Sequence, residues 1–200
     1  MKVEIRNDSV EIEGYVNAVG RESRPLRDSD GYFTEIVEPG TFARALQRGK
    51  REMLLDHDAS RVIGKEGENL TLAEDNIGLY ARATVTDPEV IEKAKRGELR
   101  GWSFGFVALK QRRAERDGMP LRTLEEIDLR EVSLIDDKMR PAYVATSVHT
   151  RSESGEEVEF RAMDGDTVSV TEADAPDGSE KHAEIDYQPY FDRIKELRGE

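Results

Sequence analysis

The stretch LRGWSFGFV, residues 99–107, indicates an aromatic β-strand that contains two glycines. Trp102 and Phe104 flank Ser103, and Gly105 follows two positions later. Bulky side chains of this kind can wall a cleft, whereas a glycine lets another backbone approach closely. Taken alone, a serine in an aromatic strand is more often a small residue on the less buried face. The stretch therefore predicts a strand more firmly than it predicts a site.

Short strands with alternating apolar residues are predicted on both sides of this stretch. Thr41 is expected to cap a short helix, Phe42 to Arg48, and a second helix of about ten residues is expected between Asp87-Pro88 and Gly97. The polar residues 111–119 predict a loop, and Asp75-Asn76-Ile77-Gly78 predicts a hairpin turn between two strands. Strands are expected at 3–5, 10–16, 33–37, 53–55, 62–64, 70–72, 79–85, 99–107, 124–135 and 143–148.

The charge distribution divides the chain into a domain, residues 1–150, and a tail, residues 151–200. The tail holds 15 acidic against 6 basic residues, which accounts for −9 of the total net charge of −13. Its composition of Glu, Asp, Ser, Gly and Thr predicts a flexible, partly disordered segment. Apolar residues at helical spacing between Tyr187 and Leu197 predict a small amphipathic helix near the end.

Composition also argues against several classes of function. The acidic balance argues against a nucleic-acid binder, because such proteins need basic surfaces to displace counterions from phosphates. With no cysteine there is no disulfide, thiolate zinc site or cysteine nucleophile. No stretch approaches the roughly 20 apolar residues of a membrane span, and the N-terminus lacks a signal-peptide pattern. The expectation is a soluble, non-secreted protein that binds neither nucleic acid nor membrane.

The chain has three histidines, and His57 is the leading candidate for a general base. An imidazole with a pKa near ~6.5 suits the task of taking a proton from a serine hydroxyl. Its neighbours Asp56 and Asp58 leave a second interpretation open, a magnesium or manganese site made of all three residues. Adjacent residues of a strand point to opposite faces, which disfavours that convergence. From the residues alone, a structural role for His57 and Ser103 remains the commoner case.

The order and spacing of six segments resemble the HK97-type prohead serine proteases of tailed viruses. These segments span about two-thirds of the chain. They are Phe33-Thr-Glu-Ile-Val-Glu-Pro-Gly-Thr-Phe42, Met53-Leu-Leu-Asp-His-Asp58, Val62-Ile-Gly64, Asp75-Asn-Ile-Gly-Leu79, Gly97-Glu-Leu-Arg-Gly-Trp-Ser-Phe-Gly-Phe106 and Asp128-Leu-Arg-Glu-Val-Ser-Leu-Ile135.

The resemblance implies catalytic roles for particular residues. His57 is implied as the base and Ser103 as the nucleophile, with Glu131 as the best match for an acidic third member. Asp128 is the second choice for that position, and His149 ranks below both. No cofactor and no metal are implied. The implied fold is mainly β with some α, a closed β-barrel of short strands ringed by a few helices, as in the distantly similar herpesvirus assemblin protease.

The function implied by the resemblance is peptide hydrolysis during capsid maturation. The expected substrates are the scaffold, or the scaffold-like segment of the major capsid protein, and the protease itself. The expected location is inside the viral procapsid in the host cytoplasm, and a homo-oligomer is expected. Two other interpretations remain: a non-enzymatic capsid-assembly or scaffold protein on a protease-like fold, and a metal-dependent nuclease that uses Asp56, His57 and Asp58.

Overall fold

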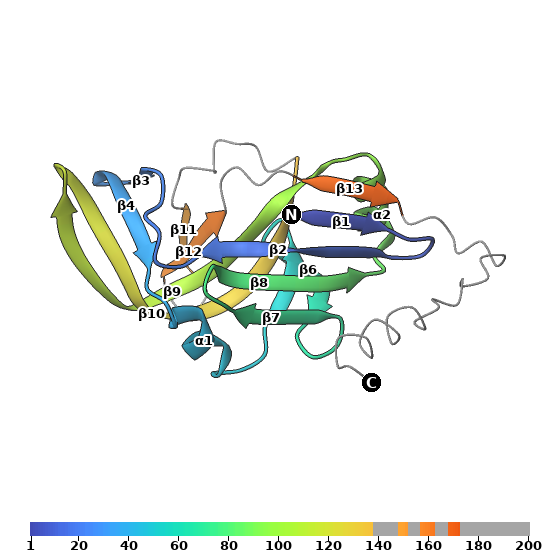
Figure 1. The fold of residues 1–200 in the computed structure, drawn as a ribbon, viewed down its shortest axis with the longest axis horizontal. Helices are drawn as coiled ribbons and strands as arrows, with labels where there is room; N and C mark the ends of the chain where they lie inside the picture. Colours follow the sequence, from blue (N-terminus) through green and yellow to red (C-terminus); the bar gives the residue numbers. More distant parts are fainter. Residues whose placement is uncertain (138–147, 152–156, 163–167, 173–200) are drawn as a thin grey trace, which may run out of the picture.

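The fold is seen in a computed structural model that describes residues 1–137, 148–151, 157–162 and 168–172. Strands dominate these residues, and two short helices interrupt them (Figure 1). In chain order the elements are β1 (Lys2–Ile5), β2 (Val10–Ala18), β3 (Leu26–Asp28), β4 (Gly31–Val37), α1 (Thr41–Leu46), β5 (Glu52–Leu55), β6 (Asp58–Lys65), β7 (Leu70–Glu74), β8 (Gly78–Val85), α2 (Pro88–Lys95), β9 (Leu99–Arg116), β10 (Met119–Asp136), β11 (Val148–Arg151), β12 (Glu157–Ala162) and β13 (Ser169–Glu172).

The first sheet has five strands in the order β13-β1-β2-β8-β7. All its pairings are antiparallel except that of β13 with β1, which is parallel. Alternate residues of β2 and β8 are buried, so one face of this sheet is apolar. The predicted hairpin turn lies between β7 and β8, where Asp75 Oδ1 accepts hydrogen bonds from the backbone of Ile77 and Gly78 at 2.7 and 3.1 Å. The local sequence thus sets the register of this hairpin.

The second sheet is built on β9 and β10, which form one long antiparallel ribbon (Figure 1). Its main path has the order β11-β12-β9-β10-β4-β3, and β5 and β6 join through β10. On its other edge β10 pairs in parallel with β4 near one end and with β5 near the other. β5 in turn pairs with β6. The β9–β10 ribbon therefore forms the centre of this sheet. β12 pairs with its β9 edge, and β4 and β5 pair with its β10 edge.

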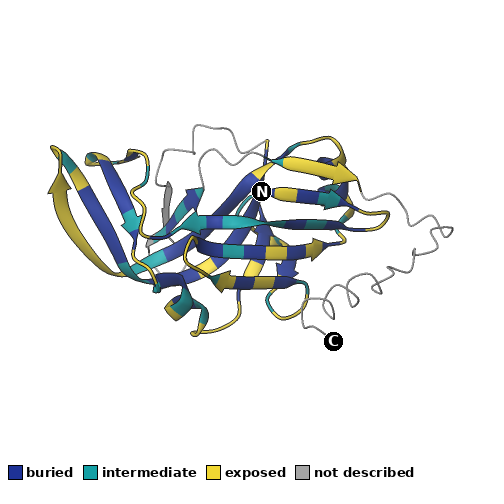
Figure 2. Ribbon diagram, in the orientation of Figure 1, coloured by how far each residue is buried: buried dark blue, intermediate teal, exposed yellow. Residues whose placement is uncertain are grey.

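The hydrophobic core lies between the two sheets, where β2 packs against β9 (Figure 2). Trp102, Phe104 and Phe106 of β9 are almost fully buried in it. Phe104 stacks on Phe106 with ring centroids 5.2 Å apart and meets Phe42 of α1 edge-on at 5.3 Å. Such pairs add about 0.5–1.5 kcal/mol each beyond their buried area. The aromatic stretch that indicated a strand is thus the centre of the core.

The two helices begin in different ways. Asp87 caps α2 as expected, accepting hydrogen bonds from the backbone N–H groups of Glu89 and Val90 at 2.9 and 3.1 Å. Thr41 does not cap α1, which begins after Gly40 without a cap from that residue's side chain. Instead the carboxylate of Glu74, on β7, accepts hydrogen bonds from Gly40 N and Ala43 N at 2.5 and 2.7 Å. A residue distant in sequence therefore supplies the cap.

The prediction of a closed β-barrel was wrong, because neither sheet closes on itself. Within the described residues, β7 pairs only with β8, and β13 pairs only with β1. A barrel needs its first and last strands to pair, with tilt and stagger matched around the ring. The strands were predicted largely where they lie, but their edge pairing is not encoded in the local alternation of residues.

Two further expectations differ from the structure. The polar stretch 111–119 is not a loop, because β9 continues to Arg116 and β10 begins at Met119, with Asp117 and Gly118 between them. Parts of the predicted flexible tail, β12 and β13, pair with β9 and β1. The strand predicted at 143–148 lies outside the described residues except for Val148, where β11 begins, and the helix predicted at 187–197 lies outside them entirely.

Candidate active site

His57 lies in the two-residue turn that joins β5 to β6. Both turn residues are left-handed, with φ of 55° at Asp56 and 60° at His57. Positive φ at both central residues is typical of a type I′ turn, whose twist matches a tight antiparallel hairpin. This conformation is uncommon for residues other than glycine, although aspartate and histidine are enriched in it. The turn places the imidazole at the tip of the hairpin.

Backbone hydrogen bonds fix this turn against the end of β10. Asp56 N donates to the carbonyl of Leu134 at 2.9 Å, and His57 N donates to Ser133 Oγ at 3.2 Å. Asp136 N donates to Asp56 Oδ1 at 2.9 Å. Three bonds to one strand hold the left-handed turn in place, and with it the position of the histidine ring.

Ser103 lies on β9 with its hydroxyl next to this ring. Ser103 Oγ is 2.8 Å from His57 Nε2, and the serine is only 1% exposed. The flanking Trp102 and Phe104 point into the core and are also buried. Because successive side chains of a strand alternate between faces, this arrangement leaves Ser103 on the face that meets the histidine.

Glu131 lies on β10, directly opposite Gly105 of β9 in the ribbon. Glu131 Oε1 is 2.7 Å from His57 Nδ1, and the glutamate is 8% exposed. A Cβ atom added to Gly105 would lie 2.6 Å from this same oxygen, closer than real Cβ atoms come. A glycine is therefore needed at this position so that Glu131 Oε1 can lie against the backbone of β9 while it contacts His57.

Ser133 is a positioning residue to which the sequence analysis gave no role. It is fully buried, and Ser133 Oγ donates to Glu131 Oε2 at 2.6 Å while it accepts from His57 N. One hydroxyl thus holds both the carboxylate and the backbone of the histidine turn. The signal that could have identified it is its spacing, because residues 131 and 133 share one face of a strand.

The strand β12 covers the site from the remaining edge of β9. Its residues Phe160, Arg161 and Ala162 pair with Gly105, Phe104 and Ser103. Ser103 Oγ donates to the carbonyl oxygen of Arg161 at 2.8 Å. The Phe160 and His57 rings lie 4.3 Å apart, tilted by 55°. The serine is buried because this strand lies over it.

The other sequence candidates lie elsewhere. Asp128 Oδ2 forms an ion pair with Arg130 Nε at 3.2 Å, on the part of β10 that faces Val107. Asp58 Oδ1 accepts from the backbone and hydroxyl of Ser60, at 2.8 and 2.6 Å. The backbone of His149 lies in β11, opposite Glu159. The three residues 56–58 thus do not converge on one point.

Neither a metal site nor a membrane-spanning helix is found within the described ranges. They contain no group of three or more His, Cys, Asp or Glu residues placed to hold a metal ion. No helix among these residues is long and apolar enough to cross a membrane.

A buried charged cluster lies behind the histidine turn. Lys93 of α2 is 2% exposed, and its Nζ is 2.5 Å from Asp136 Oδ2. Burial raises the pKa of Asp56 above its ordinary value; the hydrogen bond from the Asp136 backbone opposes this, whereas the negative charge of Asp136 adds to it. The lysine offsets this repulsion between the two carboxyl groups. The cluster therefore links the helix to the strand ends that hold the turn.

A histidine with a carboxylate on one ring nitrogen and a serine hydroxyl on the other is the arrangement found in serine hydrolases. The chain belongs to the caudovirus prohead serine proteases, since the model of that family matches residues 1–161. It is therefore a serine peptidase of the prohead type, the class that acts in capsid maturation. The match extends beyond residue 150 and ends within β12.

The other two comparisons add no further relative. Neither the curated proteins nor the solved structures gave a match. The expected likeness to the herpesvirus assemblin protease therefore has no support from them, and the open sheets differ from the barrel which that likeness implied.

Proposed function

We propose that the chain is an endopeptidase that uses Ser103 as nucleophile, His57 as general base and Glu131 as the group that orients the imidazole. The observation that carries this proposal is the continuous series of contacts from Glu131 Oε1 to His57 Nδ1, 2.7 Å, and from His57 Nε2 to Ser103 Oγ, 2.8 Å. Both distances suit hydrogen bonds that transfer or hold a proton.

The reaction proceeds through an acyl-enzyme. His57 Nε2 takes the proton of the Ser103 hydroxyl as the oxygen attacks the peptide carbonyl carbon. Glu131 accepts the hydrogen bond of Nδ1–H, which fixes the tautomer and stabilises the imidazolium that forms. His57 then gives its proton to the leaving amine. In the second half of the reaction a water molecule, deprotonated by His57, hydrolyses the ester and restores the serine.

The proposed substrates are proteins of the assembling procapsid. The prohead type implies a capsid-protein substrate, and we assign the scaffold, or a scaffold-like segment of the major capsid protein, as the part removed. The reaction would take place inside the procapsid, in the host cytoplasm, and self-association of the enzyme belongs to the same proposal. Residues 1–150 form the peptidase domain in this scheme, and residues 151–200 its tail.

Replacing the nucleophile tests the proposed mechanism. Ser103→Ala is expected to reduce cleavage of capsid or scaffold protein by on the order of 10⁶-fold, because the loss of a triad nucleophile removes the covalent route. Cleavage is measured by gel and mass spectrometry on purified proteins, with Ser9→Ala, a buried serine of the other sheet region, as the matched variant. Undiminished cleavage by the Ser103→Ala protein would disprove the assignment.

The same variant tests self-cleavage of the tail. The active chain is expected to lose residues from its C-terminal region on incubation, whereas the Ser103→Ala chain keeps its full mass of 22.6 kDa. Intact-mass spectrometry of both preparations gives the comparison. If the two masses stay identical under conditions in which capsid protein is cleaved, the tail is not a substrate of its own enzyme.

A further inference from the structure

The strand β12 occupies the position beside Ser103 that a peptide substrate needs. It pairs antiparallel with β9 over four positions, from Glu159 opposite Phe106 to Ala162 opposite Ser103. On its other edge β9 pairs with β10. Without β12, the N–H and C=O groups on this edge of β9 would lack a neighbouring strand. Such an edge binds extended peptides by adding them to the sheet.

The carbonyl of Arg161 competes with His57 for the serine proton. A hydroxyl has one proton to donate, and Ser103 Oγ lies 2.8 Å from both the Arg161 carbonyl oxygen and His57 Nε2. When the proton points to Arg161, the serine is not activated by the histidine. The residue on β12 closest to the reaction is therefore Arg161, with the bond to Ala162 next to the nucleophile.

Four buried charged side chains hold β12 on the body of the protein. Glu35 of β4 and Arg122 of β10 belong to the body, and Glu159 and Arg161 belong to β12; each is no more than 9% exposed. Arg161 makes a bidentate contact with Glu35, at 2.9 and 3.0 Å, and its guanidinium lies 5.3 Å from the Phe106 ring centroid. Paired charges with this geometry are among the stronger polar contacts.

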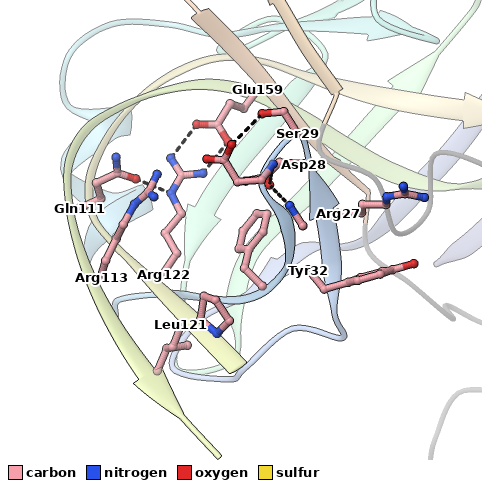
Figure 3. Close-up of a pocket in the computed structure, with 13 residues that line it drawn as sticks. Arg27, Asp28, Ser29, Tyr32, Gln111, Arg113, Leu121, Arg122 and Glu159 are labelled. Carbon is pink, nitrogen blue, oxygen red and sulfur yellow. Dashed lines mark hydrogen bonds and ion pairs between the residues drawn. The ribbon is translucent and has the colours of Figure 1, made fainter. Parts of the chain in front are cut away.

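Arg122 makes the matching contact with Glu159 (Figure 3). Its two terminal nitrogens bond the carboxylate oxygens of Glu159 at 2.5 and 2.6 Å, and Gln111 Oε1 accepts from Arg122 Nε. Gln111, Arg122 and Glu159 line a pocket together with residues of the β3–β4 hairpin, as the figure shows. The volume of this pocket is about 790 Å³. The body thus offers a carboxylate for a basic side chain and a guanidinium for an acidic one.

The charges of the body also pair with each other. Arg122 Nη1 lies 3.2 Å from Glu35 Oε2, so these two groups remain an ion pair when β12 is absent. Removing β12 does not leave an isolated buried charge, which would otherwise cost several kcal/mol. Glu159 and Arg161 also pair with each other, at 2.7 Å. Each side of this contact thus keeps an ion pair of its own, so β12 can separate from the rest of the protein and bind to it again.

A cavity of about 230 Å³ lies beside Arg161. It is lined by Leu26, Glu35, Val37, Arg161 and Ala162 and by residues of the partly exposed segment 17–24. The space filled by the Arg161 side chain would add to this cavity if β12 left, with the Glu35 carboxylate on its wall. A pocket of this kind binds a long basic side chain.

We propose that the β9 edge at residues 103–106 is the substrate-binding edge and that β12 occupies it as an internal substrate-like strand. Glu35 and Arg122 then select peptides that have an acidic residue two positions before a basic one. This inference rests on the proposed peptidase function. Residues two apart on a strand share a face, so one peptide presents both charges to the body together. While β12 is bound, the enzyme is inhibited by its own chain.

Release of β12 tests the inhibition. The Arg161→Ala variant of the full chain loses the contact with Glu35, and the rate at which a fluorophosphonate labels Ser103 is expected to rise at least about tenfold as the uncovered population grows. Arg82→Ala, an exposed arginine of β8, is the matched control and is expected to label like the unchanged chain. A labelling rate in Arg161→Ala equal to or below that of the control would overturn the inhibition.

Peptide selection tests the role of Glu35. A quenched fluorescent peptide with the sequence of residues 157–162 is compared with one that has Gln in place of its arginine. The Arg161→Ala chain is expected to prefer the arginine peptide in kcat/KM by on the order of 10²-fold, because the guanidinium can make two charge-assisted hydrogen bonds to the Glu35 carboxylate that a glutamine cannot make. The preference is expected to vanish in the Glu35→Gln, Arg161→Ala double variant; equal preference in both would overturn the assignment of Glu35.

Amide hydrogen exchange in the unchanged chain gives a test that needs no variant. If β12 is a removable strand, amides of residues 158–162 exchange through local opening, at lower free energy than those of residues 129–134 in β10. Equal protection in both segments would make β12 an integral strand and overturn the inference. Absence of labelling and cleavage in every folded variant would instead contradict the peptidase function itself, together with the inference that rests on it.

Discussion

At the scale of single residues, Glu131 does two things with its two oxygens. One accepts from the imidazole of His57 and the other from the hydroxyl of Ser133. The carboxylate is therefore held by one neighbour while it orients the other, so its rotation away from the histidine costs a buried hydrogen bond. This is why the side chain is expected to act through the tautomer of His57 and not through contact with substrate.

The Glu131→Gln variant tests this role. An amide can present its NH₂ group to His57 Nδ1 and favour the wrong tautomer, so kcat/KM on a peptide substrate is expected to fall by on the order of 10⁴-fold. Asp128→Asn is the matched control on the same strand, because Asp128 pairs with Arg130 away from the histidine. A large loss in the Asp128 variant with an active Glu131 variant would reassign the third position.

Gly105 offers a second test of the same geometry. In the Gly105→Ala variant the new methyl group meets Glu131 Oε1 and the Phe160 ring, and displacement of the carboxylate is expected to lower kcat by on the order of 10²-fold. Gly101→Ala is the control, because a Cβ at that position on the same strand meets nothing within 4 Å. Equal kcat in the two variants would mean that the close approach has no part in catalysis.

At the scale of elements, β12 is sensitive to pH through Glu159. Burial alone would raise its pKa, but the hydrogen bond from Arg122 and the charges of Arg161 and Arg122 outweigh it and hold the pKa at about 2, below the usual 4.5. A depressed carboxyl pKa contributes stability that is fully present above pH 4.5 and is lost as the pH falls to about 2.

The docking of β12 is therefore expected to weaken between about pH 4.5 and 2. Hydrogen exchange of residues 158–162, corrected for its intrinsic pH dependence, measures this as a loss of protection relative to β10. In the Glu159→Gln variant the dependence in this window is expected to disappear. Unchanged protection of the original chain down to pH 2 would contradict the prediction.

How far the elements could be predicted depends on what fixes each one. The turn at 75–78 and the start of α2 could be predicted because Asp75 and Asp87 bond the backbone two and three residues away. The outer half of β9 was predicted as a loop, because its residues are polar and only pairing with β10 makes it a strand. The cap of α1 comes from Glu74, which no local pattern reveals.

The candidate site was predictable only in part. Residue chemistry singled out His57, but the choice of Ser103 and Glu131 came from a family resemblance, and their proximity depends on the ribbon register that sets Gly105 opposite Glu131. The acidic composition of residues 151–200 gave no indication of β12. Its charged residues are paired across the fold, Glu159 with Arg122 and Arg161 with Glu35. Such pairing has no signature in composition.

At the scale of the whole molecule, the buried pair of Lys93 and Asp136 joins α2 to the site. The Lys93→Met variant leaves the carboxyl groups of Asp56 and Asp136 close together without the ammonium group, and the free energy of unfolding is expected to fall by about 3–5 kcal/mol. Urea denaturation at pH 7 measures this change. The loss is expected to shrink at lower pH, where protonation of Asp56 removes the repulsion.

Lys95→Met is the matched control for this variant. Lys95 lies on the same helix but is exposed and pairs only with Glu92, at 2.9 Å, within the described residues. Surface pairs of this kind contribute about 0–1 kcal/mol. Similar losses in the two variants would show that the buried pair adds nothing to the stability of the molecule beyond an ordinary surface contact.

The position of β12 in the chain also has a consequence for the time course of synthesis. His57, Ser103 and Glu131 are all translated before β12, and 25 residues separate Glu131 from Glu157. At about 5–20 residues per second the ribosome needs about 1–5 s for this interval. Each newly made chain thus holds the three proposed catalytic residues before it holds the strand that covers Ser103, and the order of translation sets how briefly the β9 edge is open.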